Sequence, residues 1–161
     1  MRTCKYPVYR HYGNDHFKKT LVKNIKQRDF GWGKPFGGFW ACRTDADLSW
    51  KDYCEMEEFR LDCFDKHFDF TLKDNAKILL IKNISEFVNI KKEHEEWFLK
   101  NEYIQFCDLS ETFDFVKLST LFDGIEIYAG SDRELYFKFY GWDCDSIVIF
   151  NRDIVEVLKE V

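Results

Sequence analysis

The sequence predicts an α+β fold built on a mixed or mainly antiparallel β-sheet. The first observation behind this prediction is that segments of strand period and helix period alternate irregularly along the chain. The second is that short turn sequences, such as Lys73-Asp74-Asn75, separate successive strand patterns, as in hairpins. The third is that no internal repeat or low-complexity segment occurs.

Length and composition predict one domain with an aromatic-rich core. The chain has 161 residues without a Pro-, Gly- or Ser-rich linker, and 19% of them are aromatic. The net charge is −5, and the basic residues are scattered. This distribution argues against a surface that follows a nucleic-acid backbone, but it leaves room for a small basic pocket.

The cysteines predict reduced thiols and no metal site. The chain has six cysteines, but they form no C-x-x-C pair and no His lies at zinc-ligand spacing. The first residues contain no apolar signal core, and no run of 18 or more apolar residues occurs anywhere. We therefore expect a cytosolic protein without a membrane partner.

Residues 34–54 are the most informative stretch of the sequence, because they combine a Gly-rich strand with a helix that carries aromatic residues. Gly38 and the glycine before it permit a flat ligand to approach the backbone closely. Ser49 can cap the following helix, in which Trp50 and Tyr53 share a face. This stretch is either one wall of a ligand cleft or an ordinary strand, turn and core helix.

The remaining elements follow from periodicity and turn residues. The patterns predict strands at 5–12, 37–42, 122–128 and 144–150, and a hairpin of two strands, 67–72 and 76–81, in the middle of a sheet. They predict helices at 49–63, 85–103, 110–121 and 131–140. A loop or short helix is expected within 16–33, and a strand or helix at 154–161. The 76–81 strand, Ala-Lys-Ile-Leu-Leu-Ile, is expected to be fully buried.

Common catalytic signatures are absent from the sequence. No phosphate-binding loop, G-x-G-x-x-G, H-E-x-x-H or G-x-S-x-G motif occurs, which removes the usual nucleotide-loop, metalloprotease and hydrolase interpretations. Cysteines and histidines are both present, but their spacing does not favour a Cys/His nucleophile pair.

Four stretches, in this order, resemble a known superfamily. The first is His11-Tyr12-Gly13 at a strand end, and the second is Gly38-Phe39-Trp40-Ala41, followed by a helix at Ser49-Trp50-Lys51-Asp52-Tyr53-Cys54. The third is the strand pair Phe68–Leu72 and Ala76–Leu79. The fourth is Asp145–Asn151, with Phe122-Asp123-Gly124-Ile125 upstream of it. Together they resemble the ADP-ribosyltransferase superfamily, in particular the branch of the poly(ADP-ribose) polymerases and related bacterial toxins. Lys34–Trp40 and Gly141–Ile147 also resemble stretches of a group of small bacterial and phage proteins.

The resemblance covers roughly residues 5–155 and implies a fold and a set of ligand contacts. The implied fold has split mixed or antiparallel sheets around a cleft for NAD⁺, with flanking helices. His11 would bond the adenosine-side ribose, and the backbone near Gly13 would meet the nicotinamide amide. Trp40 or Tyr53 would stack on the nicotinamide ring, and Ser49 would reach its carboxamide. A lone histidine at a strand end can equally be a core or surface side chain.

The sequence departs from the superfamily at the glutamate that stabilises the positively charged ribosyl transition state. The matching position here is Ser146, and Asp145 lies one residue earlier, on the opposite face of a regular strand. Three alternatives remain. A bulge turns Asp145 into the cleft, Glu126 on the neighbouring strand supplies the charge, or the protein does not transfer ADP-ribose.

Two functional hypotheses follow, and a third interpretation stands beside them. The first is a mono-ADP-ribosyltransferase that uses NAD as substrate to modify a protein or nucleic-acid target, in conflict between bacterium and phage. The second is a non-catalytic nucleotide- or protein-binding module of the same fold, acting as a phage inhibitor of host defence. The third is an unrelated α+β domain whose aromatic stretches form the core.

Overall fold

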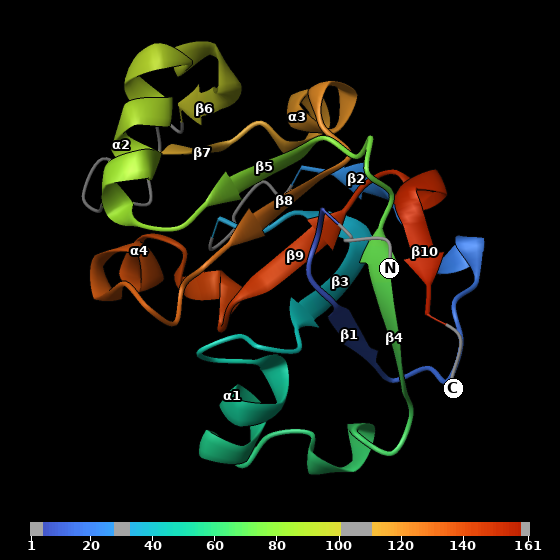
Figure 1. Cartoon of the computed structure of the whole chain (residues 1–161). Helices are drawn as coiled ribbons and strands as arrows, with labels where there is room; N and C mark the ends of the chain where they lie inside the picture. The colour runs from blue at the N-terminus through green and yellow to red at the C-terminus, as the bar shows by residue number, and fades with distance from the viewer. Residues whose placement is uncertain (1–4, 28–32, 101–110, 159–161) are drawn as a thin grey trace.

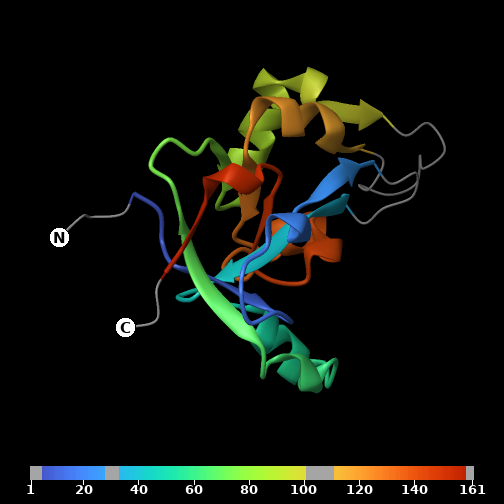
Figure 2. The same ribbon diagram turned by 90° about the vertical axis from the view of Figure 1, so that its right-hand side faces the viewer.

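The computed structural model describes residues 5–27, 33–100 and 111–158 and confirms the α+β class. Within these residues, eight strands form one curled sheet, and Figure 1 shows its course. Their order across the sheet is β10 (Val155–Val157), β4 (His67–Leu72), β1 (Tyr9–Tyr12), β3 (Phe36–Arg43), β9 (Ser146–Ile149), β8 (Gly124–Ile127) and β5 (Ile78–Ile81), with β2 (Lys23–Lys26) paired to β3. Figure 2 shows how strongly β4 bends along its length.

The sheet is mainly antiparallel, as predicted, but the predicted hairpin is wrong. Strand β4 pairs with β1 and β10, whereas β5 lies at the far edge and pairs with β8 in parallel. The edge position also explains why β5 is not fully buried. Leu79 and Ile81 are buried, while Ile78 and Leu80, which alternate with them, are partly exposed.

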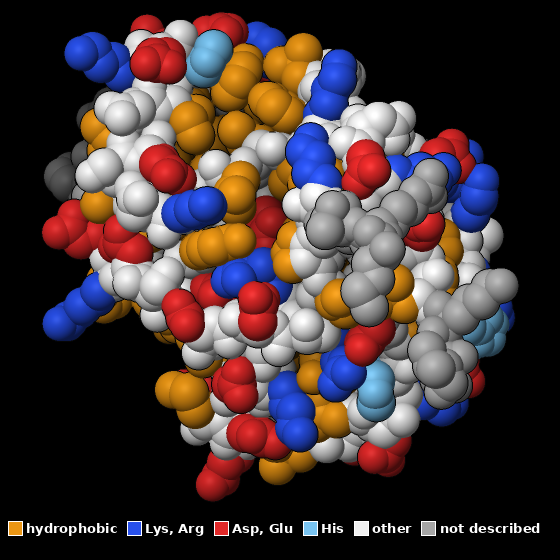
Figure 3. All heavy atoms as spheres, viewed as in Figure 1, with side chains coloured by type: hydrophobic (Ala, Val, Ile, Leu, Met, Phe, Trp, Pro, Cys, Tyr) orange, Lys and Arg blue, Asp and Glu red, His pale blue; other side chains and the backbone are white. Residues whose placement is uncertain are grey.

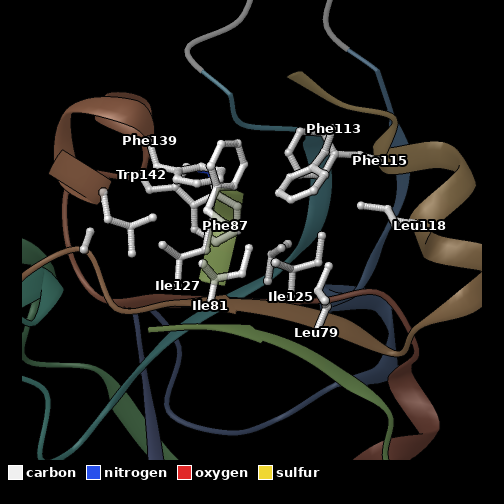
Figure 4. Close-up of a cluster of buried hydrophobic side chains, with 13 residues drawn as sticks. Leu79, Ile81, Phe87, Phe113, Phe115, Leu118, Ile125, Ile127, Phe139 and Trp142 are labelled. Atoms are coloured by element: carbon white, nitrogen blue, oxygen red, sulfur yellow. The ribbon is translucent and has the colours of Figure 1, made fainter. Parts of the chain in front are cut away.

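Helices cover one face of the β5–β8–β9 half of the sheet. Figure 4 shows the core beneath them, to which β5 contributes Leu79 and Ile81 and β8 contributes Ile125 and Ile127. The covering helices are α2 (Ile84–Glu93), α3 (Phe115–Leu121) and α4 (Arg133–Lys138), and a small sheet of β6 (Phe98–Lys100) and β7 (Glu111–Phe113) lies beside them. A second core, which includes Tyr9, Phe39 and Phe70, fills the other face. Both cores contain many aromatic side chains alongside the aliphatic ones, as the composition predicts.

Several element boundaries differ from the prediction. Helix α1 covers only Trp50–Met56, because Glu58 and Arg60 adopt left-handed backbone angles that end it. The polar segment before residue 28 contains β2, and the segment after Glu93 continues as a 3₁₀ turn and β6. The predicted helix over 110–121 begins only at Phe115, after β7. The predictions for residues 28–32, 101–110 and 159–161 lie outside the described residues, as do Cys4 and Cys107.

The resemblance implied split sheets, but the main sheet of the described residues is continuous, and its strands β1 and β3 diverge within it. Strands β1 and β3 are in register only at Tyr9↔Arg43 and Arg10↔Cys42, whereas β1 and β4 stay paired over four residues. Beyond Arg10 the backbones of β1 and β3 therefore separate. The side chains along this divergence line a cavity.

Candidate functional site

A cavity of about 280 Å³ lies where β1 and β3 diverge, and we call it the β1–β3 pocket. Strand β1 contributes Arg10 to Tyr12, β3 contributes Trp40 to Cys42, and β9 contributes Ser146. Residues outside the sheet complete the wall, among them Trp50 at the start of α1 and Trp142 before β9. The pocket is therefore built by segments from both ends of the chain.

Three cations line the β1–β3 pocket, and no Asp or Glu is among the described residues that line it. Arg10 forms a bidentate pair with Asp69, at 2.7 and 2.8 Å. Lys34 lies 3.6 Å from Asp143 and 5.0 Å from the centre of the Trp40 ring. Arg60 forms no ion pair within the described part of the chain, so its charge remains available to an anion.

Tryptophans give the pocket flat walls with fixed orientations. The rings of Trp40 and Trp142 meet edge to face, with centroids 4.8 Å apart. Each indole N–H donates to a backbone carbonyl, Trp40 to Gly37 and Trp142 to Gly33. Trp50 is held from behind by the Tyr53 ring, at 5.7 Å. Because these hydrogen bonds and contacts hold the rings, a planar ligand could stack there at low entropic cost.

His11 lies in the pocket wall with both ring nitrogens already bonded. Its Nδ1 is 2.7 Å from the Trp40 carbonyl and its Nε2 is 3.0 Å from the Asn14 side-chain nitrogen. Burial lowers the pKa of His11, which favours the neutral ring. A neutral ring that donates from Nδ1 to the carbonyl and accepts at Nε2 satisfies both contacts. His11 thus holds β1 to β3 where the strands diverge.

Four other predicted ligand residues do not line the β1–β3 pocket. Gly13 adopts a φ of +98° and donates its N–H to the Lys66 carbonyl, in the turn after β1. Gly38 is packed against β9, where a β-carbon would lie 2.4 Å from Val148 Cγ2. Ser49 caps α1 through a reciprocal hydrogen-bond pair with Asp52. Tyr53 faces a separate hollow of about 480 Å³ between α1 and α4.

The two predicted carboxylates lie together, but away from the β1–β3 pocket. Glu126 is opposite Ile147 in the β8–β9 ladder, and Ser146 is opposite Ile127, so Glu126 and Ser146 point to opposite faces. Asp145 lies on the Glu126 side, where its carboxylate accepts from the Gly130 N–H. Neither the bulge at Asp145 nor an inward Glu126 therefore brings a carboxylate to this pocket.

Arg43 joins the two carboxylates in a buried cluster. Its Nη2 lies 3.2 Å from Asp145, and its Nε lies 3.2 Å from Glu126 without hydrogen-bond geometry. The Tyr9 hydroxyl donates to Glu126 at 2.9 Å, and the Tyr128 ring lies 3.8 Å from the guanidinium carbon. We call these five residues the Arg43 cluster.

Burial governs the protonation of the Arg43 cluster. It raises the pKa of Glu126 to about 7, although the Tyr9 hydrogen bond and Arg43 act in the opposite direction. Burial also raises the pKa of Asp145, against the Gly130 N–H and Arg43. One guanidinium thus faces two buried carboxyl groups. Near neutral pH, Glu126 is protonated in part of the molecules.

The sequence pattern did not identify most of the pocket. Arg10 and Tyr12 are two residues apart on β1 and therefore lie on the same face of the strand. This spacing is a sequence signal that could have placed both at one site. Lys34 and Arg60 reach the pocket from irregular segments, so periodicity carries no signal for them. Trp142 belongs to the Gly-Trp-Asp stretch that we expected to end a helix, and we assigned it no ligand contact.

No group of three or more His, Cys, Asp or Glu among the described residues is placed to hold a metal ion. No helix in that part of the chain is long and apolar enough to span a membrane. Comparison of the chain with protein-family models, curated proteins and solved structures gave no match. The functional argument therefore rests on the geometry of the site.

Proposed function

We propose that the protein is a nucleotide-binding module that holds a phosphate-bearing nucleotide in the β1–β3 pocket without cleaving it. The observation that carries the proposal is the composition of the pocket wall, which combines three cations with three tryptophans and contains no acidic side chain among the described residues. Aromatic faces suit a base, and guanidinium and ammonium groups suit phosphate oxygens.

The electrostatics of the whole chain strengthen this proposal. The protein carries a net charge of −5, so a cationic pocket is a local exception to the overall charge. The face shown in Figure 3 carries scattered groups of both signs rather than a continuous basic surface. A small anion is therefore a better candidate for the pocket than a nucleic-acid duplex.

The size of the pocket and the backbone at its mouth favour a compact ligand. A volume of about 280 Å³ lies at the lower end of the range of small-molecule sites, which suits a mononucleotide better than a complete dinucleotide. Arg60 has a φ of +50°, and such strained backbone is commonly retained where it positions a functional group. Here it holds an unpaired cation beside the aromatic wall.

The second candidate is an NAD-consuming ADP-ribosyltransferase. It is favoured by one observation, that His11, Trp40 and Ser146 come together at one pocket although they lie far apart in sequence. These positions match those that the resemblance assigns to the NAD cleft. This function still requires a carboxylate near the ribosyl cation, and Glu126 and Asp145 would have to reach it from the Arg43 cluster.

Tryptophan fluorescence tests the first proposal directly, because Trp40, Trp50 and Trp142 line the pocket. ADP and ADP-ribose should change the emission saturably, adenosine should act more weakly because it lacks phosphate, and added salt should weaken the nucleotide response. The absence of a saturable change up to ~1 mM nucleotide would contradict the proposal. A Kd of that size corresponds to a binding free energy of only about −4 kcal/mol.

Incubation with NAD⁺ separates the two candidates. A binding module releases no nicotinamide, alone or with cell lysate. Nicotinamide release that is lost in both Glu126→Gln and Asp145→Asn would support the transferase instead. The exposed variant Glu156→Gln serves as the matched control.

A further inference from the structure

Two cysteines meet at the inner wall of the β1–β3 pocket. Cys42 is on β3 and lines the pocket, and its Sγ lies 3.7 Å from the Sγ of Cys144, just before β9. Ser146, which also lines the pocket, places its hydroxyl oxygen 3.1 Å from Cys144 Sγ and 4.0 Å from Cys42 Sγ. The Trp50 N–H donates to Cys42 Sγ at 3.2 Å.

The hydrogen bonds distinguish the roles of the two sulfurs. Cys42 Sγ accepts a hydrogen bond from the Trp50 N–H, and the Ser146 hydroxyl and the Cys144 thiol also lie within contact distance of it. When the hydroxyl and the Cys144 thiol orient as donors, all three groups stabilise a Cys42 thiolate. They lower the pKa of Cys42, with the Cys144 contact as the largest cause and burial opposing it. The same contact, together with burial, raises the pKa of Cys144. Cys42 is therefore the nucleophile, and Cys144 keeps its proton.

Access to the pair is through the pocket. Both residues are almost completely buried, at 4% and 1% exposure, so an oxidant reaches them only by entering the cavity that Cys42 lines. Cys63 offers a comparison within the same chain, because it is a partly exposed free thiol outside this pocket. Among the four cysteines that the structure describes, exposure alone would make Cys63 the first to react.

We propose that Cys42 and Cys144 form a reversible dithiol–disulfide site that a small hydroperoxide oxidises through the β1–β3 pocket. The Cys42 thiolate attacks the peroxide O–O bond, giving a sulfenic acid and an alkoxide or hydroxide that takes up a proton. The Cys144 thiol then attacks this sulfur, forming the S–S bond and releasing water. The two sulfurs together lose two electrons to the peroxide, and an external thiol restores the dithiol.

Disulfide formation would also change the pocket. The sulfurs must approach from 3.7 Å to about 2.05 Å, which draws the segment before β9 toward β3. That segment carries Trp142, whose carbonyl accepts the Cys144 N–H and whose ring packs against Trp40. We expect the oxidised protein to bind ADP several-fold more weakly, an effect that rests on the proposed nucleotide site.

Peroxide treatment followed by non-reducing peptide mapping tests the disulfide without any ligand. The expected product joins the Cys42 and Cys144 peptides, has two hydrogen atoms fewer, and returns to the dithiol with a reducing agent. Cys42→Ala and Cys144→Ala should each abolish it, whereas Cys63→Ala, the matched control, should leave it unchanged. The Cys42→Ala variant should leave Cys144 unmodified at the same peroxide dose.

Two results would overturn the proposal. One is oxidation of Cys63 while Cys42 and Cys144 remain reduced in the wild-type protein, a measurement that does not depend on any variant folding. The other is recovery of Cys42 as a sulfinic acid with Cys144 unmodified. If the disulfide forms but neither redox state binds ADP, the proposed nucleotide function fails while the redox site stands.

Discussion

The Nη2 atom of Arg43 lies 3.2 Å from Oδ2 of Asp145, and the two side chains are 11% and 2% exposed. Removing the guanidinium in Arg43→Met would leave Asp145 and Glu126 facing each other in a buried site. We expect a loss of about 3–5 kcal/mol in the free energy of unfolding, measured by denaturant titration at neutral pH.

Arg10→Met is the matched control for this experiment. The Arg10–Asp69 pair lies near the surface, with side chains that are 36% and 31% exposed, so its loss should cost about 1 kcal/mol or less. Equal effects of the two substitutions would show that the Arg43 cluster is not a distinct source of stability.

The raised pKa of Glu126 predicts a fall in stability as the pH rises. The folded-state pKa is about 7, above the ordinary 4.5, so the folded protein retains a proton that the unfolded chain releases between these values. The stabilisation is complete below pH 4.5 and is lost as the pH rises through 7. Its size is on the order of 2–3 kcal/mol. Denaturant midpoints at pH 5 and pH 8 measure the effect.

Substitutions assign this pH dependence to Glu126. Glu126→Gln should flatten the decline between pH 5 and pH 8, because the amide does not titrate. Glu156→Gln, at an exposed position in β10, should retain it. An unchanged slope in Glu126→Gln would place the titration elsewhere.

Gly38→Ala should destabilise the sheet strongly. Gly38 has a φ of +69°, and an added β-carbon would lie 2.4 Å from Val148 Cγ2, so backbone strain and overpacking act together. We expect a cost of about 2–5 kcal/mol, measured by thermal or denaturant unfolding. Gly13→Ala is the control, because its φ is +98° but nothing lies within 4 Å of the added carbon. It should cost only the backbone part, about 1–2 kcal/mol.

Arg60→Ala should weaken nucleotide binding without a comparable loss of stability. Arg60 is exposed and lines the β1–β3 pocket, so its removal takes away one contact with phosphate. We expect about a fivefold rise in the Kd for ADP, roughly 1 kcal/mol, by fluorescence titration. Arg152→Ala, which removes an exposed arginine outside the pocket, should leave the Kd unchanged. Equal effects of the two variants would indicate general charge attraction rather than a site.

The sequence predicted the strands whose patterns are set by burial. His67–Leu72 shows a period of two, and the short runs that form β8 and β9 are rich in isoleucine and buried at every position. Strand β2 was missed because Lys23–Lys26 contains one apolar residue, and pairing with β3 rather than its own pattern makes it a strand. Pairing was also the source of the hairpin error, since a turn between two strands does not fix their neighbours.

The sequence identified residues of the candidate pocket only where a short motif contained them. His11 and Trp40 were identified within short motifs and do lie at one pocket, but the hydrogen bonds that occupy His11 depend on residues 29 and 3 positions away. The Arg43 cluster draws on strands β1, β3 and β8 and on the segment before β9, so no local pattern could identify it. The orientation of Asp145 followed correctly from strand alternation alone.

The strand order has a consequence for how the chain acquires its structure. Strand β9, near the carboxyl terminus, lies between β3 and β8, and β10 completes the pairing of β4. An emerging polypeptide therefore cannot assemble this sheet until residues near 157 have left the ribosome, and closing such distant segments makes folding slow. During synthesis the apolar strands are therefore exposed before the strands that pair with them have been made. A chaperone bound at this stage would protect them from aggregation with other chains.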